Sequence, residues 1–357
     1  MKYSFKIASI WGIPIELHIT FILLMAAVAF LSYPSFYLFT LIVFLFIFVV
    51  LHELAHTFVA RHYHIKVRKI VLYPIGGVSE IEEVPENPSI EWRLAAAGPL
   101  TSLLIGVILL ALNQVTLIAA PRTLIGESLT TAGSFMLDLA VLNLLLGAFN
   151  LLPAFPMDGG RVFRAILAER MKFTDATKYA AYIGRLFGIA MVVFGIVFPT
   201  YFLLIIVGLF VYIGATEEAE QTIVSTTLAS VRVSDVTCAE IATVTPESSL
   251  TQALDIMFKA RYHDAIVEKN GVFLGVVVWD DLVKIKPGER NQLKIEQMPI
   301  RKIAVFPDES VLEAQKIMTR ERIDVMPVVD RQNQSKIVCV LTTEGLAASY
   351  EKAKNLR

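Results

Sequence analysis

The sequence has little cysteine, and this shortage limits the kinds of protein it can encode. Only two cysteines occur among its 357 residues, Cys238 and Cys339, and both lie in the C-terminal part. Two thiols support neither a disulfide framework nor a thiolate metal site. A reduced, cytosolic C-terminal part is the simplest interpretation.

Charged residues are scarce over long stretches of the N-terminal part. Residues 7–60 and 94–215 hold long apolar runs, and the whole chain is 55% hydrophobic with a mean hydropathy of +0.61. A soluble enzyme of this length is less apolar. Residues 216–357 are instead rich in Glu, Lys, Arg and Asp. The sequence therefore predicts a membrane protein with a soluble tail.

Two further features are also missing from the sequence. The net charge is -1 and no basic stretch interleaved with aromatic residues occurs, so we expect no nucleic acid partner. The N-terminus carries Lys2 and Lys6, but no small-residue cleavage site follows its first apolar run. We therefore expect that first hydrophobic segment to be retained.

The apolar runs predict six transmembrane helices, because a bilayer core needs about 20 apolar residues per helix. The expected spans are 14–33, 38–61, 94–114, 131–152, 180–198 and 200–216. The predicted fold is thus an α-helical polytopic membrane protein with a short β hairpin, followed by a soluble α/β tandem module.

Lysine and arginine in the short loops predict the orientation. The connections 61–93 and 153–179 are rich in Lys and Arg, whereas the opposite loops carry little beyond Arg122. We therefore place the two basic connections on the cytosolic side. With six crossings, both termini and the tail are also cytosolic, and the protein is a multi-pass cell-membrane protein.

Residues 69–81, "KIVLYPIGGVSEI", predict the hairpin, since they alternate like a strand and break at Gly76-Gly77. The hairpin either packs against the helices or lies plainly in the cytosol. The first arrangement is possible at membrane depth only where protein or a wet cavity satisfies the backbone.

The tail contains an internal repeat. "VTPESSLTQALDIMFKAR" at 244–261 aligns with "VFPDESVLEAQKIMTRER" at 305–322, and each copy continues into apolar strands. This pattern resembles a pair of CBS modules, which implies a pseudo-twofold disc that often binds adenine nucleotides. We expect a membrane domain at 1–216, a linker at 217–231, and CBS repeats at 232–288 and 289–357.

The stretch "HELAH" places His52, Glu53 and His56 within an apolar helix. Residues i and i+4 share one helix face, so both imidazoles can reach one metal ion while Glu53 lies on the adjacent face. Polar groups inside a membrane helix are costly and usually functional. The bland alternative is that neighbouring helices merely satisfy these three side chains.

A catalytic zinc site needs a third protein ligand, and Asp158 in "FNLLPAFPMDGGRVFRA" is the candidate. Pro153 and Pro156 cannot continue a helix, and the glycines after Asp158 permit a sharp turn. Asp158 also lies at the cytosolic end of the fourth span, at the depth expected for the two histidines. A solvated aspartate at an ordinary helix end is the alternative.

These motifs in their order resemble the site-2 protease family of intramembrane zinc metalloproteases, in the subgroup with a C-terminal CBS pair. The resemblance rests on "HELAH", "GGVSE", "AAAGPL" and "NLLPAFPMDGG". It implies that His52, His56 and Asp158 bind one Zn²⁺ per chain, that Glu53 is the general base, and that Asn150 holds substrate or polarises the scissile carbonyl.

The resemblance implies regulated intramembrane proteolysis, in which transmembrane protein substrates in the lipid bilayer are cut near the cytosolic face. The alternatives are a CBS-regulated transporter or channel with a structural metal site, and a catalytically dead scaffold. The six spans show no internal duplication of the kind that transporters carry.

The resemblance also implies residues that would bind ATP or AMP in the tail. The family motif ends in a hydroxyl residue followed three positions later by an aspartate. The first repeat keeps Asp281 but has Val278 at the hydroxyl position, and the second keeps Thr342 but has Gly345 at the acid position. Nucleotide sensing and a purely structural, homodimer-forming module both remain open.

For the other histidines we expect no role in binding the metal. His18 begins the first expected helix, His62 and His64 follow the "HELAH" helix, and His263 is in the tail. We expect all of these to be structural or solvated. Gly98-Pro99 is expected to permit close helix packing, with any role near the metal secondary.

Overall fold

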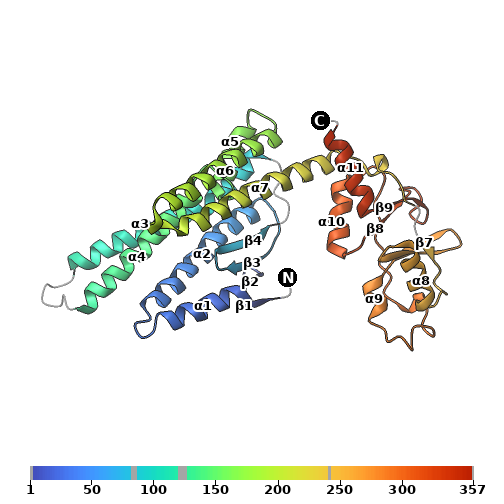
Figure 1. Cartoon of the computed structure of the whole chain (residues 1–357), viewed down its shortest axis with the longest axis horizontal. Helices are drawn as coiled ribbons and strands as arrows, with labels where there is room; N and C mark the ends of the chain where they lie inside the picture. Colours follow the sequence, from blue (N-terminus) through green and yellow to red (C-terminus); the bar gives the residue numbers. More distant parts are fainter. Residues whose placement is uncertain (1–2, 82–86, 120–126, 240–242, 356–357) are drawn as a thin grey trace. The chain divides into compact units, whose positions relative to one another are not determined.

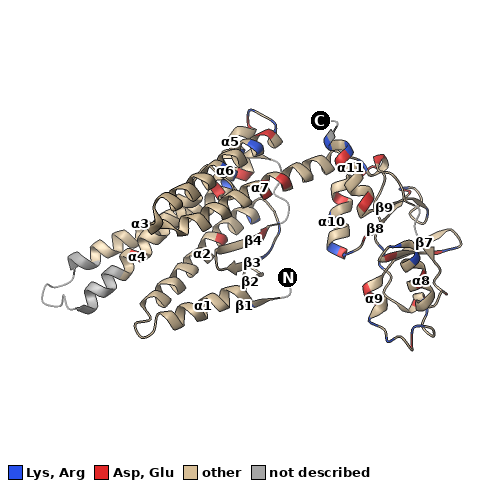
Figure 2. Ribbon diagram, viewed as in Figure 1, with Lys and Arg blue, Asp and Glu red and all other residues tan. Residues whose placement is uncertain are grey.

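The computed structural model describes residues 3–81, 87–119, 127–239 and 243–355, so Arg122 lies outside the described residues. The chain forms two compact units, residues 1–220 and 221–357. We call them the membrane unit and the tail, and describe each by itself. Few charged residues occur along the long helices of the membrane unit, whereas they are spread over the tail (Figure 2).

Long helices make up most of the membrane unit. They are α1 Ile19–Leu31, α2 Tyr37–His62, α3 Pro88–Ala119, α4 Glu127–Asn150, α5 Asp158–Ala168, α6 Phe173–Val197 and α7 Leu203–Ala229, whose C-terminal end lies in the tail. A short 3-10 turn, Pro199–Tyr201, joins α6 to α7. Helices α3 and α4 run side by side (Figure 1).

Three helices within the described residues are long and apolar enough to cross a bilayer. They are α2, residues Pro88–Val115 of α3, and α6; α1 and residues Phe135–Asn150 of α4 are apolar but shorter. The helical and apolar character of this unit is confirmed. The number of six crossings stays a prediction.

The expected span 14–33 was partly wrong, because its beginning is a strand. Strands β1 Ser4–Ile10 and β2 Ile13–His18 pair antiparallel, and β2 pairs in parallel with β3 Val67–Tyr73. The alternation of "IPIELH" buries Ile13 and Ile15 on one face of the sheet, against Leu54 of α2 and Ile70. Helix α1 is therefore only 13 residues long.

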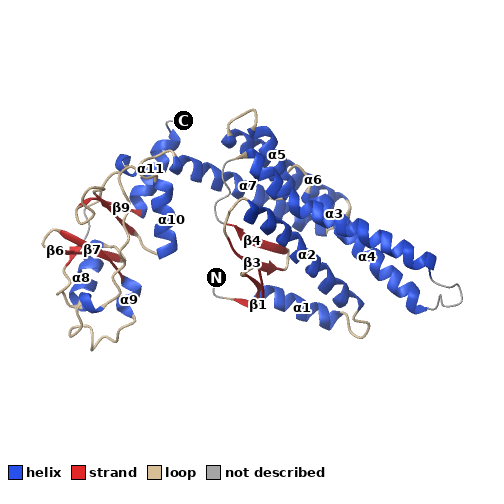
Figure 3. Cartoon of the chain, turned by 180° about the vertical axis from the view of Figure 1, so that it is seen from behind, coloured by secondary structure: helices blue, strands red, loops and turns tan. Residues whose placement is uncertain are grey.

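The expected hairpin packs against the helices. Strand β3 pairs antiparallel with β4 Gly76–Ile81, and the sheet order is β1-β2-β3-β4. The chain turns at Pro74 and Ile75, two positions earlier than the glycine pair suggested. The views in Figure 1 and Figure 3 place β3 and β4 beside α2. Among the described strands, β4 forms an edge of the sheet.

The tail contains the expected repeat. The first copy comprises β5 Thr243–Val244, α8 Leu250–Ala260, β6 Asp264–Lys269, β7 Val272–Val278 and α9 Trp279–Val283; the second comprises α10 Val311–Glu321, β8 Val325–Val329, β9 Ile337–Thr342 and α11 Thr343–Asn355. Equivalent residues begin and end the corresponding helices of the two copies. Ser249 and Ser310 cap α8 and α10 at their N-termini, and Arg261 and Arg322 end them in the left-handed conformation.

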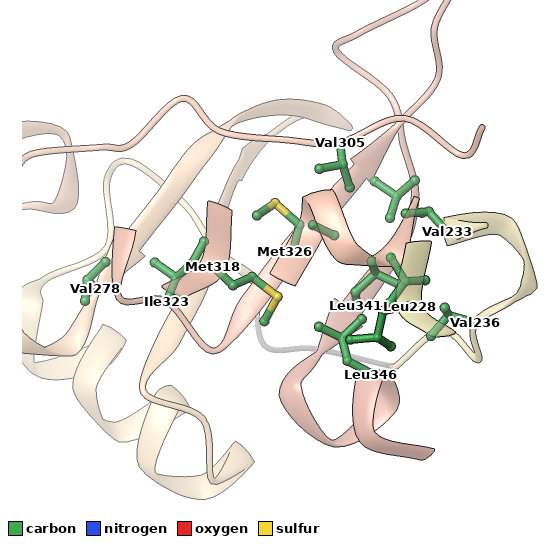
Figure 4. Close-up of a cluster of buried hydrophobic side chains, with 13 residues drawn as sticks. Leu228, Val233, Val236, Val278, Val305, Met318, Ile323, Met326, Leu341 and Leu346 are labelled. Carbon is green, nitrogen blue, oxygen red and sulfur yellow. The ribbon is translucent and has the colours of Figure 1, made fainter. Parts of the chain in front are cut away.

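The second repeat has a core to which α7 contributes. Leu228 packs with Met318, Leu341 and Leu346 among other buried residues (Figure 4). Residues 217–229, which we expected to be a linker, are therefore helical, and their end belongs to the tail core.

The expectation of reduced cysteines was wrong. Cys238 and Cys339 form a disulfide. The fold brings them together because Ala239 N–H donates to the carbonyl of Val340 in β9, a pairing that cysteine counting cannot reveal. The cysteines therefore give no support to a cytosolic tail, and the orientation depends on the Lys and Arg distribution alone.

The two repeats meet at a pair of aspartates. Asp264, at the start of β6, is buried and accepts a hydrogen bond from the backbone N–H of Asp324, just before β8. Burial and the nearby Asp324 carboxylate raise the pKa of Asp264 to about 6. The folded tail therefore holds this proton more tightly than the unfolded chain, and loses stability as pH rises from about 4 to about 6.

We expect Asp264→Asn to stabilise the tail by on the order of 2 kcal/mol at pH 8 and by much less at about pH 3.5, where the carboxyl is largely protonated in both the folded and the unfolded chain. Hydrogen exchange of peptides covering β6 and β8, compared with the wild type at each pH, measures the difference. An equal gain at both pH values, or a loss at pH 8, would contradict this assignment.

Candidate metal centre

Two histidines of α2 and one aspartate of α5 converge on one point. His52 Nε2 lies 3.2 Å from His56 Nε2, and each of these nitrogens lies 3.2 Å from Asp158 Oδ2. The two imidazoles are buried, and Asp158 is partly buried. The i, i+4 spacing within α2 places both rings on one face, as the sequence predicted.

Helix α3 orients both imidazoles. His56 Nδ1–H donates to the carbonyl of Leu94 at 2.7 Å, and His52 Nδ1 lies 2.9 Å from Ser102 Oγ. Because a carbonyl only accepts, neutral His56 carries its proton on Nδ1, and the lone pair of its Nε2 points at the other donors. Such outer partners commonly fix metal-binding histidines.

The donor set fits a zinc ion. Two imidazole nitrogens and one carboxylate oxygen that face one another suit a cation between them. Tetrahedral zinc with bonds of about 2.0–2.1 Å separates its ligand atoms by roughly 3.3 Å, close to the distances of 3.2 Å observed. Three protein donors also match the composition of catalytic zinc sites, which keep one position for water or substrate.

Gly98 of α3 makes room for this site. A Cβ atom added there would lie 2.2 Å from His56 Nε2 and 2.5 Å from His52 Nε2. The sequence analysis assigned Gly98 to helix packing and ranked a role near the metal as secondary. The structure corrects this, because only a glycine lets α3 approach the two imidazoles so closely.

We expect Gly98→Ala to displace both imidazoles and to lower zinc affinity at least about tenfold. Gly106→Ala on the same helix is the matched control, because its Cβ would instead meet Leu144 at 2.7 Å, away from the site. Metal content after dialysis against a weak chelator measures zinc binding, and the melting temperature measures any general loss of stability. Equal zinc retention in both variants would contradict the role of Gly98.

Glu53 lies beside the sheet. Ser79 Oγ of β4 donates to Glu53 Oε2 at 2.6 Å, and a Cβ on Gly77 would lie 2.6 Å from Glu53 Cγ. The hairpin therefore contacts the carboxylate next to the metal donors, which explains why β4 carries a glycine and a serine there.

Asp158 is held where α5 begins. The chain leaves α4 at Asn150 and re-enters a helix at Asp158. Cβ atoms on Gly159 and Gly160 would lie 2.3 Å from the Leu152 carbonyl oxygen and 2.6 Å from the Ala154 carbonyl carbon. The two glycines thus allow the first turn of α5 to pack directly on the preceding loop.

The Asn150 side chain is hydrogen-bonded within its own helix. Its Nδ2 donates to the carbonyl of Leu146 at 3.0 Å, one turn back in α4. The other histidines lie elsewhere. His18 caps α1 and packs on Tyr73, whereas His62, His64 and His263 are exposed.

The two nucleotide candidates in the tail are already engaged. The Asp281 carboxylate lies 2.7 Å from Lys284 Nζ and 3.1 Å from Arg301. Thr342 is buried, and its Oγ1 accepts a hydrogen bond from Gly345 N–H at 3.1 Å.

The partners of the two imidazoles were not predicted from the sequence. Ser102, Gly98 and the Leu94 carbonyl all lie on α3, in the stretch "LAAAGPLTS". Their signal was a run of small residues in an apolar helix, which permits close helix approach but does not name what approaches.

Comparison with known proteins identifies the family. Residues 40–134 and 117–193 match peptidase family M50, and residues 233–288 and 295–351 match the CBS domain. A zinc metalloprotease of Methanocaldococcus jannaschii is 40% identical over 279 residues, which are 78% of this chain and 78% of that protein.

Two further proteins are similar to this chain. A Mycobacterium tuberculosis protein named as a zinc metalloprotease, Rip3, is 31% identical over 68% of this chain and 63% of its own length. The solved site-2 protease of Methanocaldococcus jannaschii is 43% identical, covering 61% of this chain and 95% of that one, with a TM-score of 0.45. The chain belongs to the site-2 protease family of membrane-embedded zinc metalloendopeptidases, peptidase family M50, and carries a CBS domain pair.

Proposed function

We propose that His52, His56 and Asp158 bind one zinc ion and that Glu53 is the general base of an intramembrane endopeptidase. The observation that supports this most strongly is the convergence of three donor atoms at 3.2 Å beside a buried glutamate. Zinc, when bound, acidifies a water molecule and polarises a carbonyl group.

The chain's own residues account for the remaining steps. Glu53 takes a proton from the attacking water and returns it to the leaving amine. The hydrogen bond from Ser79 holds the Glu53 carboxylate toward the hairpin side of the site. Asn150 stabilises the carbonyl of the substrate after the Asn150 side-chain amide turns away from Leu146.

We infer that an apolar groove guides a substrate segment toward Glu53. The groove, of about 440 Å³, lies between α2, α4 and the hairpin turn. Its lining includes Val49, one turn before Glu53, Phe149 beside Asn150, and Gly76 beside Gly77. A transmembrane substrate fits such a lining better than a soluble peptide does, because the groove is apolar.

The substrate must unwind locally before it is cut, and β4 offers an edge for the unwound part. An extended segment added along β4 would pass Gly77 and Ser79, the two residues that contact Glu53. Replacing Gly76 and Gly77 by valine is therefore expected to impair cleavage. Unchanged cleavage would dismiss this clamp and leave the metal site intact.

The finer topology is also part of the proposal. Six crossings, cytosolic termini and cleavage near the cytosolic face follow from the apolar spans and the Lys and Arg distribution. We assign residues 1–216 to the protease domain, 217–231 to a connecting segment, and 232–288 and 289–357 to the CBS repeats, through which two copies of the chain pair. Mass mapping of the fragments of a single-span substrate in liposomes tests the position of the cut.

Regulation by nucleotide completes the proposal. ATP or AMP would reach the CBS pair at Asp281 and Thr342, after displacing the bonds that both now make. Calorimetry with ATP and AMP on the purified chain tests this. No heat at millimolar ligand would dismiss nucleotide sensing.

A further inference from the structure

A buried ion cluster joins three helices behind the metal site. Arg164 of α5 donates through Nε to Glu91 of α3 at 2.7 Å, and its guanidinium lies 5.0 Å and 4.7 Å from the ring centroids of Phe155 and Phe173. Glu91 and Arg164 are both buried. The cluster is costly to bury and must be well paired to persist.

Helix α7 adds a second carboxylate to this cluster. Glu218 Oε1 lies 3.5 Å from Arg161 and 3.6 Å from Arg164, both of α5. The Glu218 side chain is 22% exposed, and Arg161 is 36% exposed. One carboxylate of α7 therefore holds two guanidinium groups of the same short helix.

The position of α5 matters because its first residue is Asp158. The opposite wall of the metal site is α3, which supplies the Leu94 carbonyl and Ser102 to the two histidines. The pair Glu91–Arg164 joins α3 to α5, and Glu218 joins α7 to α5. The cluster thus links α5, whose first residue is Asp158, to the helix that contacts both imidazoles.

We propose that Glu218 is a positioning residue for the metal ligand Asp158, acting through Arg161 and Arg164. This inference rests on the proposed zinc site. Without the Glu218 charge, two cations on α5 lose their shared partner, and α5 is free to shift along α7. Asp158 then sits farther from the imidazoles, and zinc is held less tightly.

The test compares zinc affinity in Glu218→Gln and in Glu217→Gln, whose side chain is exposed on the same helix. Each full-length variant in detergent is titrated with zinc against a competing chelator, and kcat and KM are measured for a single-span substrate. We expect Glu218→Gln to weaken zinc binding about tenfold and to lower kcat with little change in KM, while Glu217→Gln behaves like the wild type.

The conservative variant Glu218→Asp keeps a negative charge beside Arg161 and Arg164, and we expect its zinc affinity to stay within about threefold of the wild type. Wild-type zinc affinity in Glu218→Gln, an equal loss in Glu217→Gln, or a tenfold loss in Glu218→Asp would overturn the inference and leave the proposed function standing. A wild-type chain that binds no zinc would overturn both.

Discussion

Replacing Glu53 with glutamine is expected to lower cleavage of a transmembrane substrate at least about a thousandfold while the protein keeps its zinc. Loss of a positioned general base costs 10²–10⁴ in rate. Glutamine has nearly the same shape and can still bond Ser79, so the sheet should stay in place. Glu53 is not one of the three converging donors, so zinc content should not change.

The measurement is cleavage of a single-span substrate in detergent, with zinc content determined on the same preparation. Glu80→Gln is the matched control, because Glu80 lies on β4 next to Ser79 but pairs with Lys69 at 3.6 Å. We expect the control to stay within about twofold of the wild type. Equal activity in Glu53→Gln and the wild type would refute the assignment of Glu53 as the base.

Replacing Asp158 with alanine is expected to have the opposite signature, with zinc and activity lost together. Two imidazoles alone leave the site with one protein ligand fewer than catalytic zinc requires. We expect the zinc affinity to fall more than about a hundredfold, since even loss of an outer partner costs 10–100-fold.

Asp175→Ala offers a matched control for this loss. Asp175 also lies in the first turn of a helix, α6, but it is about half exposed and pairs with Lys178 at 3.6 Å. Zinc titration of both variants decides the matter. Retention of one tightly bound zinc in Asp158→Ala would remove Asp158 from the ligand set.

The convergence of His52, His56 and Asp158 could be predicted from the sequence because the pattern that these residues form is local and rare. His52 and His56 share a face by helical spacing alone, and a charged motif in an apolar helix is conspicuous. Asp158 followed from a second constraint, namely that the ends of two helices lie at the same depth. Distances between helices were not needed for either step.

The residues that hold the ligands could not be predicted, because they act through close contact between helices. Ser102 and Gly98 are ordinary residues in an apolar helix until α3 is seen against His52 and His56. The pairing of Arg164 with Glu91 joins residues 73 positions apart. Only packing shows which buried charges meet.

The prediction of the fold was wrong for a segment whose apolar residues suit a strand as well as a helix. "IPIELH" continues into the helix of α1, so hydropathy alone extended the first span back to residue 14. This segment forms a strand because β2 pairs with β3, which lies some fifty residues further along the chain. The disulfide was missed for a similar reason, since its cysteines are 101 residues apart.

The central claim is that one zinc per chain, held by His52, His56 and Asp158, drives peptide cleavage within the membrane. The most direct test strips the purified chain of metal and measures cleavage of a single-span substrate during stepwise return of zinc. We predict that activity is absent at the start, rises linearly, and reaches its plateau at one zinc per chain. Full cleavage by the stripped chain, or no cleavage at any zinc concentration, would contradict the claim.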